Sequence, residues 1–220
     1  MTMEDRDGFI WMDGEWVEWR EAKVHVLTHT LHYGMGAFEG VRAYETSDGP
    51  AIFKLEKHTE RLFNSARILG MDIPFDSDTL NQAQRDVVKK NNLNSAYIRP
   101  MCFYGSEGMG LRADNLKVHV MIAAWEWGSY FDPKLKIEGI KLNISSWRKP
   151  SPDSIPWDTK ASGLYMINTL SKHEAEAKGY VDSLMLDYQG NVAEATGANI
   201  FFKNAAGELH TPIPDSFLDG

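Results

Sequence analysis

The sequence predicts an α+β protein in two domains, and three features support that class. Short runs of β-branched and aromatic residues alternate with Gly-containing turns, which is typical of antiparallel hairpins, and the first pair of runs flanks Asp13-Gly14. Two amphipathic helical segments, 56–69 and 78–92, interrupt the strands. Three prolines in the segment 149–156 indicate a linker. A chain of 220 residues is long enough for one large or two small domains.

Composition narrows the class of protein further. The net charge of −8 and the lack of a dense Lys/Arg cluster argue against a nucleic-acid-binding surface. The single cysteine, Cys102, excludes an intramolecular disulfide and fits a reducing compartment. Residues 1–7 are acidic and do not resemble a signal peptide, and the longest apolar run, 120–125, is too short to span a bilayer. We therefore expect a cytoplasmic protein that does not bind membranes.

The first domain, 1–148, is predicted to hold a mostly antiparallel sheet with helices. Its expected strands are 10–12, 16–17, 41–45, 51–55, 96–104, 118–125 and 140–145, and its helices are the two amphipathic segments. Tyr97 and Arg99 are two residues apart on one strand, so they share a face. Arg99 precedes Pro100, which predicts that this strand is at an edge or bulged.

The second domain, 158–220, follows the linker at 149–157 and is predicted to be β-rich. A helix is expected from Lys160 to about 178, followed by hairpins over 183–196 and 200–211. These few elements are too small to close a core of their own. We therefore expect this domain to be incomplete, and to continue beyond 220 or to complete itself against a partner.

Three histidines lie close together in the sequence, at positions 25, 29 and 32. Their spacing puts two on one face of a helix, as metal ligands require. However, the segment 21–31 alternates apolar residues like a strand and offers neither a cysteine nor a nearby pair of carboxylates. We expect no metal site here.

The segment 157–165 is where we expect the chemistry. Lys160 stands between the prolines and three small residues, Ala161, Ser162 and Gly163, which leave room for a planar ligand. A desolvated lysine loses its proton readily and becomes the nucleophilic amine that a Schiff base with an aldehyde cofactor requires. The alternative is a solvated lysine at a helix terminus, which is the usual state of a lysine.

Glu194 suggests a second functional position, since small residues flank it in a predicted strand, 191–199. A buried carboxylate needs a cation, and a protonated ring nitrogen is a suitable one. A solvent-facing glutamate is the alternative. Lys160, Tyr165, Arg61 and Glu194 together provide an amine, a phenol, a guanidinium and a carboxylate, the groups needed to hold pyridoxal phosphate. Spacing alone does not establish that they meet.

Several motifs in this order resemble those of branched-chain amino-acid aminotransferases, the fold type IV class of pyridoxal-phosphate enzymes. The resemblance covers nearly the whole chain. It is carried by residues 32–34, 38–42, 95–100 and 108–110, by Lys160 with Tyr165, and by Glu194 with Asn199.

The resemblance implies a role for each site residue. Lys160 would carry the cofactor as a Schiff base and move the substrate proton, while Glu194 would pair with the pyridine nitrogen. Tyr165 would bind the ring hydroxyl and Arg61 the phosphate. The implied substrate pocket comprises Tyr33, Phe38, Leu111, Trp127 and Tyr130, with Tyr97 and Arg99 reading the substrate carboxylates. Tyr33 and Leu111 would reach in from a second subunit, which implies a homodimer or a higher homo-oligomer.

The implied activity is amino-group transfer between Leu, Ile or Val and 2-oxoglutarate. Other fold type IV enzymes need the same cofactor groups, so a D-amino-acid or (R)-amine transaminase and an aminodeoxychorismate lyase remain alternatives. Family members continue past position 220 with Gly-Ile-Thr and Ser-Gly-Thr turns that supply backbone amides to the phosphate and the substrate. A truncated, non-catalytic fragment is therefore a third alternative.

Overall fold

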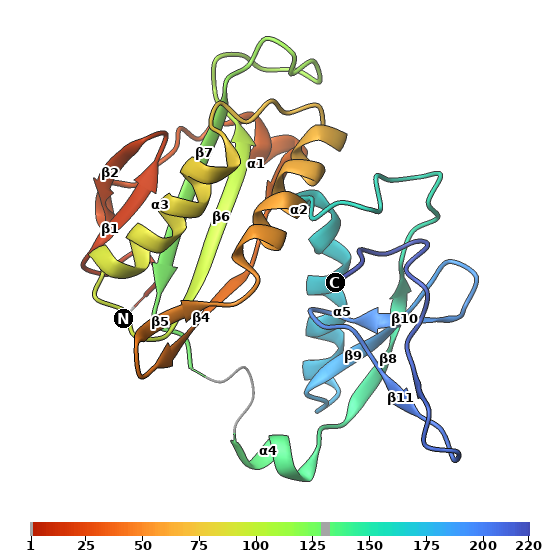
Figure 1. Cartoon of the computed structure of the whole chain (residues 1–220). Coiled ribbons are helices and arrows are strands. Elements are labelled where there is room, and N and C mark those ends of the chain that lie inside the picture. The colour runs from red at the N-terminus through yellow and green to blue at the C-terminus, as the bar shows by residue number, and fades with distance from the viewer. Residues whose placement is uncertain (1, 129–132) are drawn as a thin grey trace. The chain divides into compact units, whose positions relative to one another are not determined.

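The computed structural model describes residues 2–128 and 133–220, which form two compact units (Figure 1). Unit 1 comprises Met1–Gly128 and Thr159–Gly163, and unit 2 comprises Ser129–Asp158 and Leu164–Gly220. Each unit has its own sheet and its own helices, which confirms the predicted α+β class. None of the helices in the described residues is long and apolar enough to cross a membrane.

The described part of unit 1 contains a seven-stranded sheet in the order β2-β1-β7-β6-β4-β5, with β3 also paired to β6. Its neighbouring strands are antiparallel, and the β1–β2 and β4–β5 hairpins are those that the sequence predicts. The strands are β1 (Phe9–Met12), β2 (Glu15–Glu18), β3 (Gly36–Phe38), β4 (Val41–Thr46), β5 (Gly49–Ile52), β6 (Ala96–Tyr104) and β7 (Val118–Trp125).

The prediction that β6 is an edge or bulged strand was wrong. β6 lies inside the sheet and pairs in continuous register with β7, with Pro100 opposite Ile122. Its other side changes partner, from β4 at residues 96–98 to β3 at residues 101–103. Pro100 O accepts from Glu39 N at 2.9 Å, so the missing N–H of Pro100 faces the interruption between β3 and β4. The proline is tolerated because no regular ladder bond is needed there.

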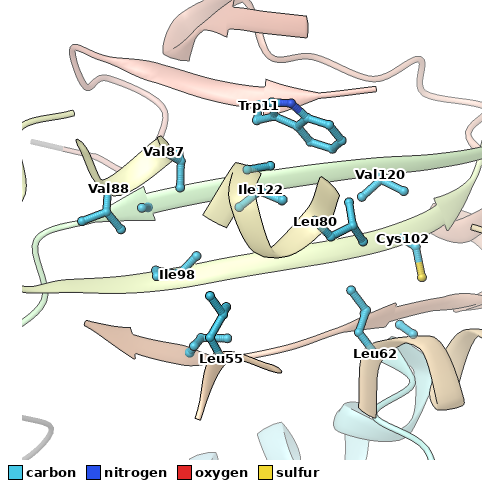
Figure 2. Close-up of a cluster of buried hydrophobic side chains, with 14 of the residues drawn as sticks. Trp11, Leu55, Leu62, Leu80, Val87, Val88, Ile98, Cys102, Val120 and Ile122 are labelled. Carbon is cyan, nitrogen blue, oxygen red and sulfur yellow. The ribbon is translucent and has the colours of Figure 1, made fainter. Parts of the chain in front are cut away.

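Two helices, α2 (Leu55–Ile68) and α3 (Ser77–Lys90), cover one face of this sheet (Figure 1). Both correspond to predicted segments, and α3 begins after Asp76, whose side chain accepts from Thr79 N at 2.7 Å. Figure 2 shows the core between the helices and the sheet, which is a continuous apolar cluster. Fully buried members include Leu62, Leu80, Val87, Ile98 and Ile122.

The histidine segment is not a strand, contrary to its apolar alternation. Residues 22–28 are irregular and lead, after the short helix η1 (Trp19–Glu21), into α1 (His29–Tyr33). His29 Nε2 lies 3.1 Å from Gly110 O, and His32 Nε2 lies 2.9 Å from Val26 O. The rings of these two histidines therefore bind backbone carbonyls.

The sheet of unit 2 has the order β10-β9-β8, formed by β8 (Leu142–Arg148), β9 (Asp182–Leu186) and β10 (Val192–Ala195). The sequence placed β8 in the sheet of the first domain, and that prediction was wrong. β8 pairs in parallel with β9, because α5 (Tyr165–Ala177) connects the two strands as a crossover helix. The remaining elements are α4 (Pro133–Glu138), η2 (Ser162–Leu164) and a hairpin of β11 (Phe202–Lys203) with β12 (Leu209–His210).

Candidate active site

Lys160 lies on an extended segment that is fixed to unit 1 by its backbone. Lys160 O accepts from Phe38 N at 3.1 Å, and Lys160 N donates to Ser65 Oγ of α2 at 3.0 Å. The next residue, Ala161, forms an antiparallel bridge with Ala37 of β3. The lysine therefore does not start a free helix end, but is held between a strand and a helix.

A glycine pair makes this attachment possible. Gly163 N donates to Gly34 O at 3.1 Å, and Gly34 adopts the left-handed φ of 69°. A Cβ on Gly34 would lie 2.9 Å from Gly163 Cα, so the two backbones approach more closely than side chains allow. The small residues around Lys160 thus serve backbone contact as well as space.

The Lys160 amine lies beside an aromatic ring. Its Nζ is 5.1 Å from the centroid of the Phe38 ring, and the residue is half-buried. This geometry contradicts the alternative of a fully solvated lysine at a helix terminus. A half-buried amine beside an aromatic ring is a candidate nucleophile.

Arg61 projects from α2 and forms a bidentate pair with Glu39. Arg61 Nε donates to Glu39 Oε1 at 2.5 Å and Nη2 donates to Oε2 at 3.0 Å. His58, one turn earlier on α2, places Nδ1 2.8 Å from the same Oε2. Glu39 itself is completely buried, at 0% exposure. The guanidinium is therefore held on one edge by a buried carboxylate.

The charge state of Glu39 follows from this surrounding. Burial alone would raise the pKa of the Glu39 carboxyl, because the charged form loses its hydration. Hydrogen bonds from His58 and Arg61, and the positive charges of Arg61 and Lys160, outweigh burial and hold the pKa below its usual value. Glu39 is thus an anion inside a group of cations.

Arg99 connects the proposed substrate residues of unit 1 into one row. Its Cζ lies 4.5 Å from the centroid of the Phe38 ring, and its Nη2 donates to Tyr97 OH at 2.8 Å. The Tyr97 ring continues the row to Trp127, with centroids 5.5 Å apart. Arg99 Nε is buried and has no hydrogen-bond partner among the described residues. A buried, unsatisfied guanidinium donor is suited to an anionic ligand.

Tyr33 and Leu111 lie in an exposed region of unit 1, and Tyr130 lies outside the described residues. The Tyr33 side chain on α1 is 40% exposed and Leu111 is 85% exposed. The bond between His29 and Gly110 attaches α1 to the loop that carries Leu111. Both residues are accessible, as a contribution to another subunit requires.

Glu194 in unit 2 is neither solvent-facing nor alone. Its Oε1 lies 2.6 Å from Lys149 Nζ, and the two side chains are 14% and 9% exposed. Lys149 Nζ also donates to Asn168 Oδ1 at 3.0 Å, and Asn168 Nδ2 donates to Thr196 O at 2.7 Å. The carboxylate thus belongs to a network that ties β10, α5 and the start of the proline-rich segment together.

Tyr165 begins α5 and is half-buried. It precedes Asn168 by three residues, so both lie on the same face of the helix. Asn168 contacts the Lys149 side chain that pairs with Glu194. Tyr165 thus begins the helix that reaches the Lys149–Glu194 pair through Asn168.

Within each unit the predicted cofactor residues are grouped. Unit 1 provides an amine and a guanidinium, with the Phe38 ring beside the amine. Unit 2 provides a carboxylate and, on the adjoining helix face, a phenol. An amine binds an aldehyde, a guanidinium binds a phosphate, and a carboxylate binds a protonated ring nitrogen. These groups fit pyridoxal phosphate.

Sequence reasoning missed the charged partners of two predicted residues, Glu39 for Arg61 and Lys149 for Glu194. In the sequence, Glu39 is one member of a motif, and Lys149 only borders the linker. A usable signal is present at Glu39, where a lone charge interrupts an otherwise small and apolar segment. No comparable signal marks Lys149.

Comparisons with known proteins point to one family. The family model for amino-transferase class IV matches residues 36–220. The chain is 53% identical over 220 residues to a branched-chain-amino-acid aminotransferase of Pseudomonas aeruginosa, covering 100% of this chain and 71% of that protein. The crystal structure of the Escherichia coli branched-chain amino acid aminotransferase is similar, with a TM-score of 0.93, 40% identity, and coverage of 98% of this chain and 71% of that chain.

A further structure with a bound compound is also similar. The T.th. branched-chain amino acid aminotransferase complexed with N-(5'-phosphopyridoxyl)-L-glutamate has a TM-score of 0.92 at 42% identity. The match covers 98% of this chain and 70% of that chain.

Proposed function

Because the chain belongs to the branched-chain-amino-acid aminotransferases of the class IV aminotransferase family, we propose that it is a transaminase that uses pyridoxal 5'-phosphate. The proposed reaction moves the amino group between Leu, Ile or Val and 2-oxoglutarate. The phosphopyridoxyl compound bound by the similar T.th. enzyme supports this choice of cofactor.

Four residues would hold the cofactor and move the proton. When bound, the cofactor supplies an electron-accepting ring for the charge left by removal of the substrate α-proton. Lys160 would bind the aldehyde, and its amine would then take the α-proton and return it. Arg61 would bind the phosphate, Tyr165 the ring hydroxyl, and Glu194 would keep the ring nitrogen protonated.

The attachment of the Lys160 backbone is the observation that carries this proposal. Phe38 N and Ser65 Oγ hold the residue from two sides, and the Phe38 ring lies beside its Nζ. A proton-transferring amine must be held close to one position, because small displacements cost large factors in rate. The two backbone contacts and the neighbouring ring support that role for Lys160.

The substrate would lie against the aromatic row of unit 1. Phe38 and Trp127 provide apolar surface for a branched side chain, together with the proposed pocket residue Tyr130. Arg99, with its buried Nε lacking a partner among the described residues, and Tyr97 provide polar groups for carboxylates. One pocket would thus accept both an apolar amino acid and glutamate.

We further propose a homodimer in which Tyr33 and Leu111 reach the pocket of the partner subunit. Their exposure of 40% and 85% supports a contribution to the pocket of another subunit. A cytoplasmic location is proposed as well, on the ground that the one cysteine, Cys102, is a buried free thiol.

The proposal is tested by glutamate formation from L-leucine and 2-oxoglutarate in the presence of added cofactor. Lys160→Ala should lower the rate by about 100- to 10,000-fold, the usual contribution of a positioned acid–base group. Borohydride reduction of the loaded protein should add the cofactor mass to the peptide that contains Lys160. A Lys160→Ala protein with unchanged turnover would contradict the proposal.

Substrate choice separates this function from its alternatives. L-Leucine should react much faster than D-alanine and (R)-1-phenylethylamine. Faster turnover of either competitor would assign the protein to another activity of the same fold. A purified protein that binds no cofactor would instead support a non-catalytic role.

A further inference from the structure

Glu39 is a buried carboxylate to which the proposed mechanism gives no task. It follows Phe38, whose ring lies beside the Lys160 amine, at the interruption between β3 and β4. Its exposure is 0%. Enclosing a carboxylate is costly unless strong donors replace the lost water. Its surroundings in unit 1 therefore indicate what it does.

Two side chains of α2, Arg61 and His58, contact this carboxylate. They are three residues apart, so both extend from the same face of the helix. Arg61 contributes two hydrogen bonds, at 2.5 and 3.0 Å, and His58 Nδ1 lies 2.8 Å from Oε2. Gly40 N adds a longer backbone bond of 3.3 Å to Oε2. Glu39 thus holds one edge of the Arg61 guanidinium.

The edge of the guanidinium that Glu39 contacts is decisive. A guanidinium is a planar fork with five N–H donors and two edges that match an oxyanion. Glu39 occupies the edge formed by Nε and Nη2. The edge formed by the two Nη atoms is then oriented by the same contact. A rotamer fixed before the ligand arrives avoids the entropic cost of fixing it on binding.

We propose that Glu39 is a positioning residue that acts through Arg61, holding the guanidinium so that its second edge binds the phosphate of the cofactor. This inference rests on the proposed function. Glu39 itself does not contact the phosphate, since two like charges would repel. Loss of the Glu39 carboxylate therefore weakens the binding of ligands that carry a phosphate. It leaves the binding of ligands without a phosphate unchanged.

The experiment compares two ligands that differ only in the phosphate. The dissociation constants of pyridoxal 5'-phosphate and of pyridoxal are measured on the purified apoprotein by equilibrium dialysis. Glu39→Gln keeps the size of the side chain but turns an amide N–H₂ group toward Arg61 or His58. Glu39→Gln should raise the dissociation constant of pyridoxal 5'-phosphate by about 10- to 100-fold and that of pyridoxal by less than about 2-fold.

Four further variants separate positioning from general damage. Arg61→Ala should show the same selective loss, and the double variant should be no worse than Arg61→Ala, because both changes remove one interaction. Glu39→Asp should be intermediate, since a shorter carboxylate reaches only one Arg61 nitrogen. Glu56→Gln is the matched control, because Glu56 lies on α2 but pairs with Arg85 at the surface. It should leave both ligands unchanged.

Each outcome supports or overturns the inference. The inference is overturned if Glu39→Gln binds pyridoxal 5'-phosphate with unchanged affinity, or loses affinity for both ligands equally. It is also overturned if the losses of affinity from Glu39→Gln and Arg61→Ala add in the double variant. Should Glu39→Gln not fold, Glu39→Asp provides the same comparison of ligands. A wild-type protein that does not bind pyridoxal 5'-phosphate would contradict the proposed function, whereas normal wild-type binding with an unaffected variant contradicts only the role of Glu39.

Discussion

Unit 1 and unit 2 each contain an ion pair that includes a residue expected to bind the cofactor. These are the Arg61–Glu39 pair and the Lys149–Glu194 pair. In each, a residue expected to bind the cofactor already holds an opposite charge from a distant part of the sequence. In unit 1 the residue expected to bind the cofactor is the cation, Arg61, and its partner is the buried anion Glu39. In unit 2 the expected residue is the anion and its partner is the lysine.

The two pairs differ in how completely their charges are surrounded. Glu39 accepts a bidentate contact from Arg61 and further contacts from His58 and Gly40 N, and it has no exposed surface. The Lys149–Glu194 contact is a single short one, at 2.6 Å, with the neutral Asn168 as an additional partner of Lys149. A charge in a more enclosed site depends more strongly on its partner. Loss of the arginine should therefore be more damaging than loss of the lysine.

The largest expected effect is that of Arg61→Ala on the stability of the apoprotein. It leaves the enclosed Glu39 carboxylate without its bidentate partner, so the free energy of unfolding should fall by about 3–5 kcal/mol. Urea unfolding at neutral pH measures the change. Arg67→Ala, on the exposed side of the same helix, is the control. A similar loss of unfolding free energy in both variants would show that the Arg61–Glu39 pair contributes no more than a surface contact.

A smaller loss is expected for Lys149→Met, about 2–3 kcal/mol in the free energy of unfolding. Methionine fills much of the lysine volume, and Glu194 retains some access to water because its side chain is 14% exposed. Lys178→Met is the control in unit 2, since Lys178 pairs with Glu174 at the surface. If Lys149→Met lowers the free energy of unfolding as much as Arg61→Ala or more, the ranking of the two pairs by enclosure is wrong.

The backbone attachment of Lys160 has no counterpart in unit 2 among the described contacts, and Gly34→Ala tests it. The new methyl group would meet Gly163 Cα at 2.9 Å on a backbone with φ of 69°. The expected loss is about 1–3 kcal/mol in urea unfolding. Gly49→Ala carries the strain of a φ of 106° without any atom within 4 Å, so the difference between the variants isolates the contact. Equal losses would show that the contact contributes nothing.

The smallest effect is a change in pH dependence. The folded-state pKa of Glu39 is below its usual value of 4.5, so its contribution to stability is present above that pH and is lost as the pH falls through the folded-state pKa. Unfolding midpoints of wild type and Glu39→Gln, followed from neutral pH to below 4, should therefore converge at acidic pH. Parallel curves would mean that the Glu39 carboxylate does not titrate in this way.

Local patterns in the sequence predicted most of the elements but not the long-range pairs. Asp13-Gly14 identified a hairpin, and the apolar stripes of α2 and α3 identified their helices, because these signals depend on neighbouring residues. The sheet to which β8 belongs depends on a crossover helix, which a single strand does not encode. The short β3 was missed because glycine and alanine carry little strand preference.

The candidate site divides in the same manner. Lys160 and Glu194 were proposed because small residues lie beside each and because they belong to the motifs of the resemblance, which also implied Arg61. Their partners, Glu39 and Lys149, were not, because an ion pair is defined by the tertiary structure alone.

Pro100 lies opposite the gap between β3 and β4, which contains Glu39 and Gly40. Because Pro100 has no N–H, β6 offers no donor to this gap at that position. At the gap, Gly40 leaves room for the hydroxyl of Tyr97, which a Cβ at position 40 would approach to 2.2 Å. That hydroxyl accepts from Arg99 Nη2, so a side chain at position 40 would disturb the contact between the phenol and the guanidinium.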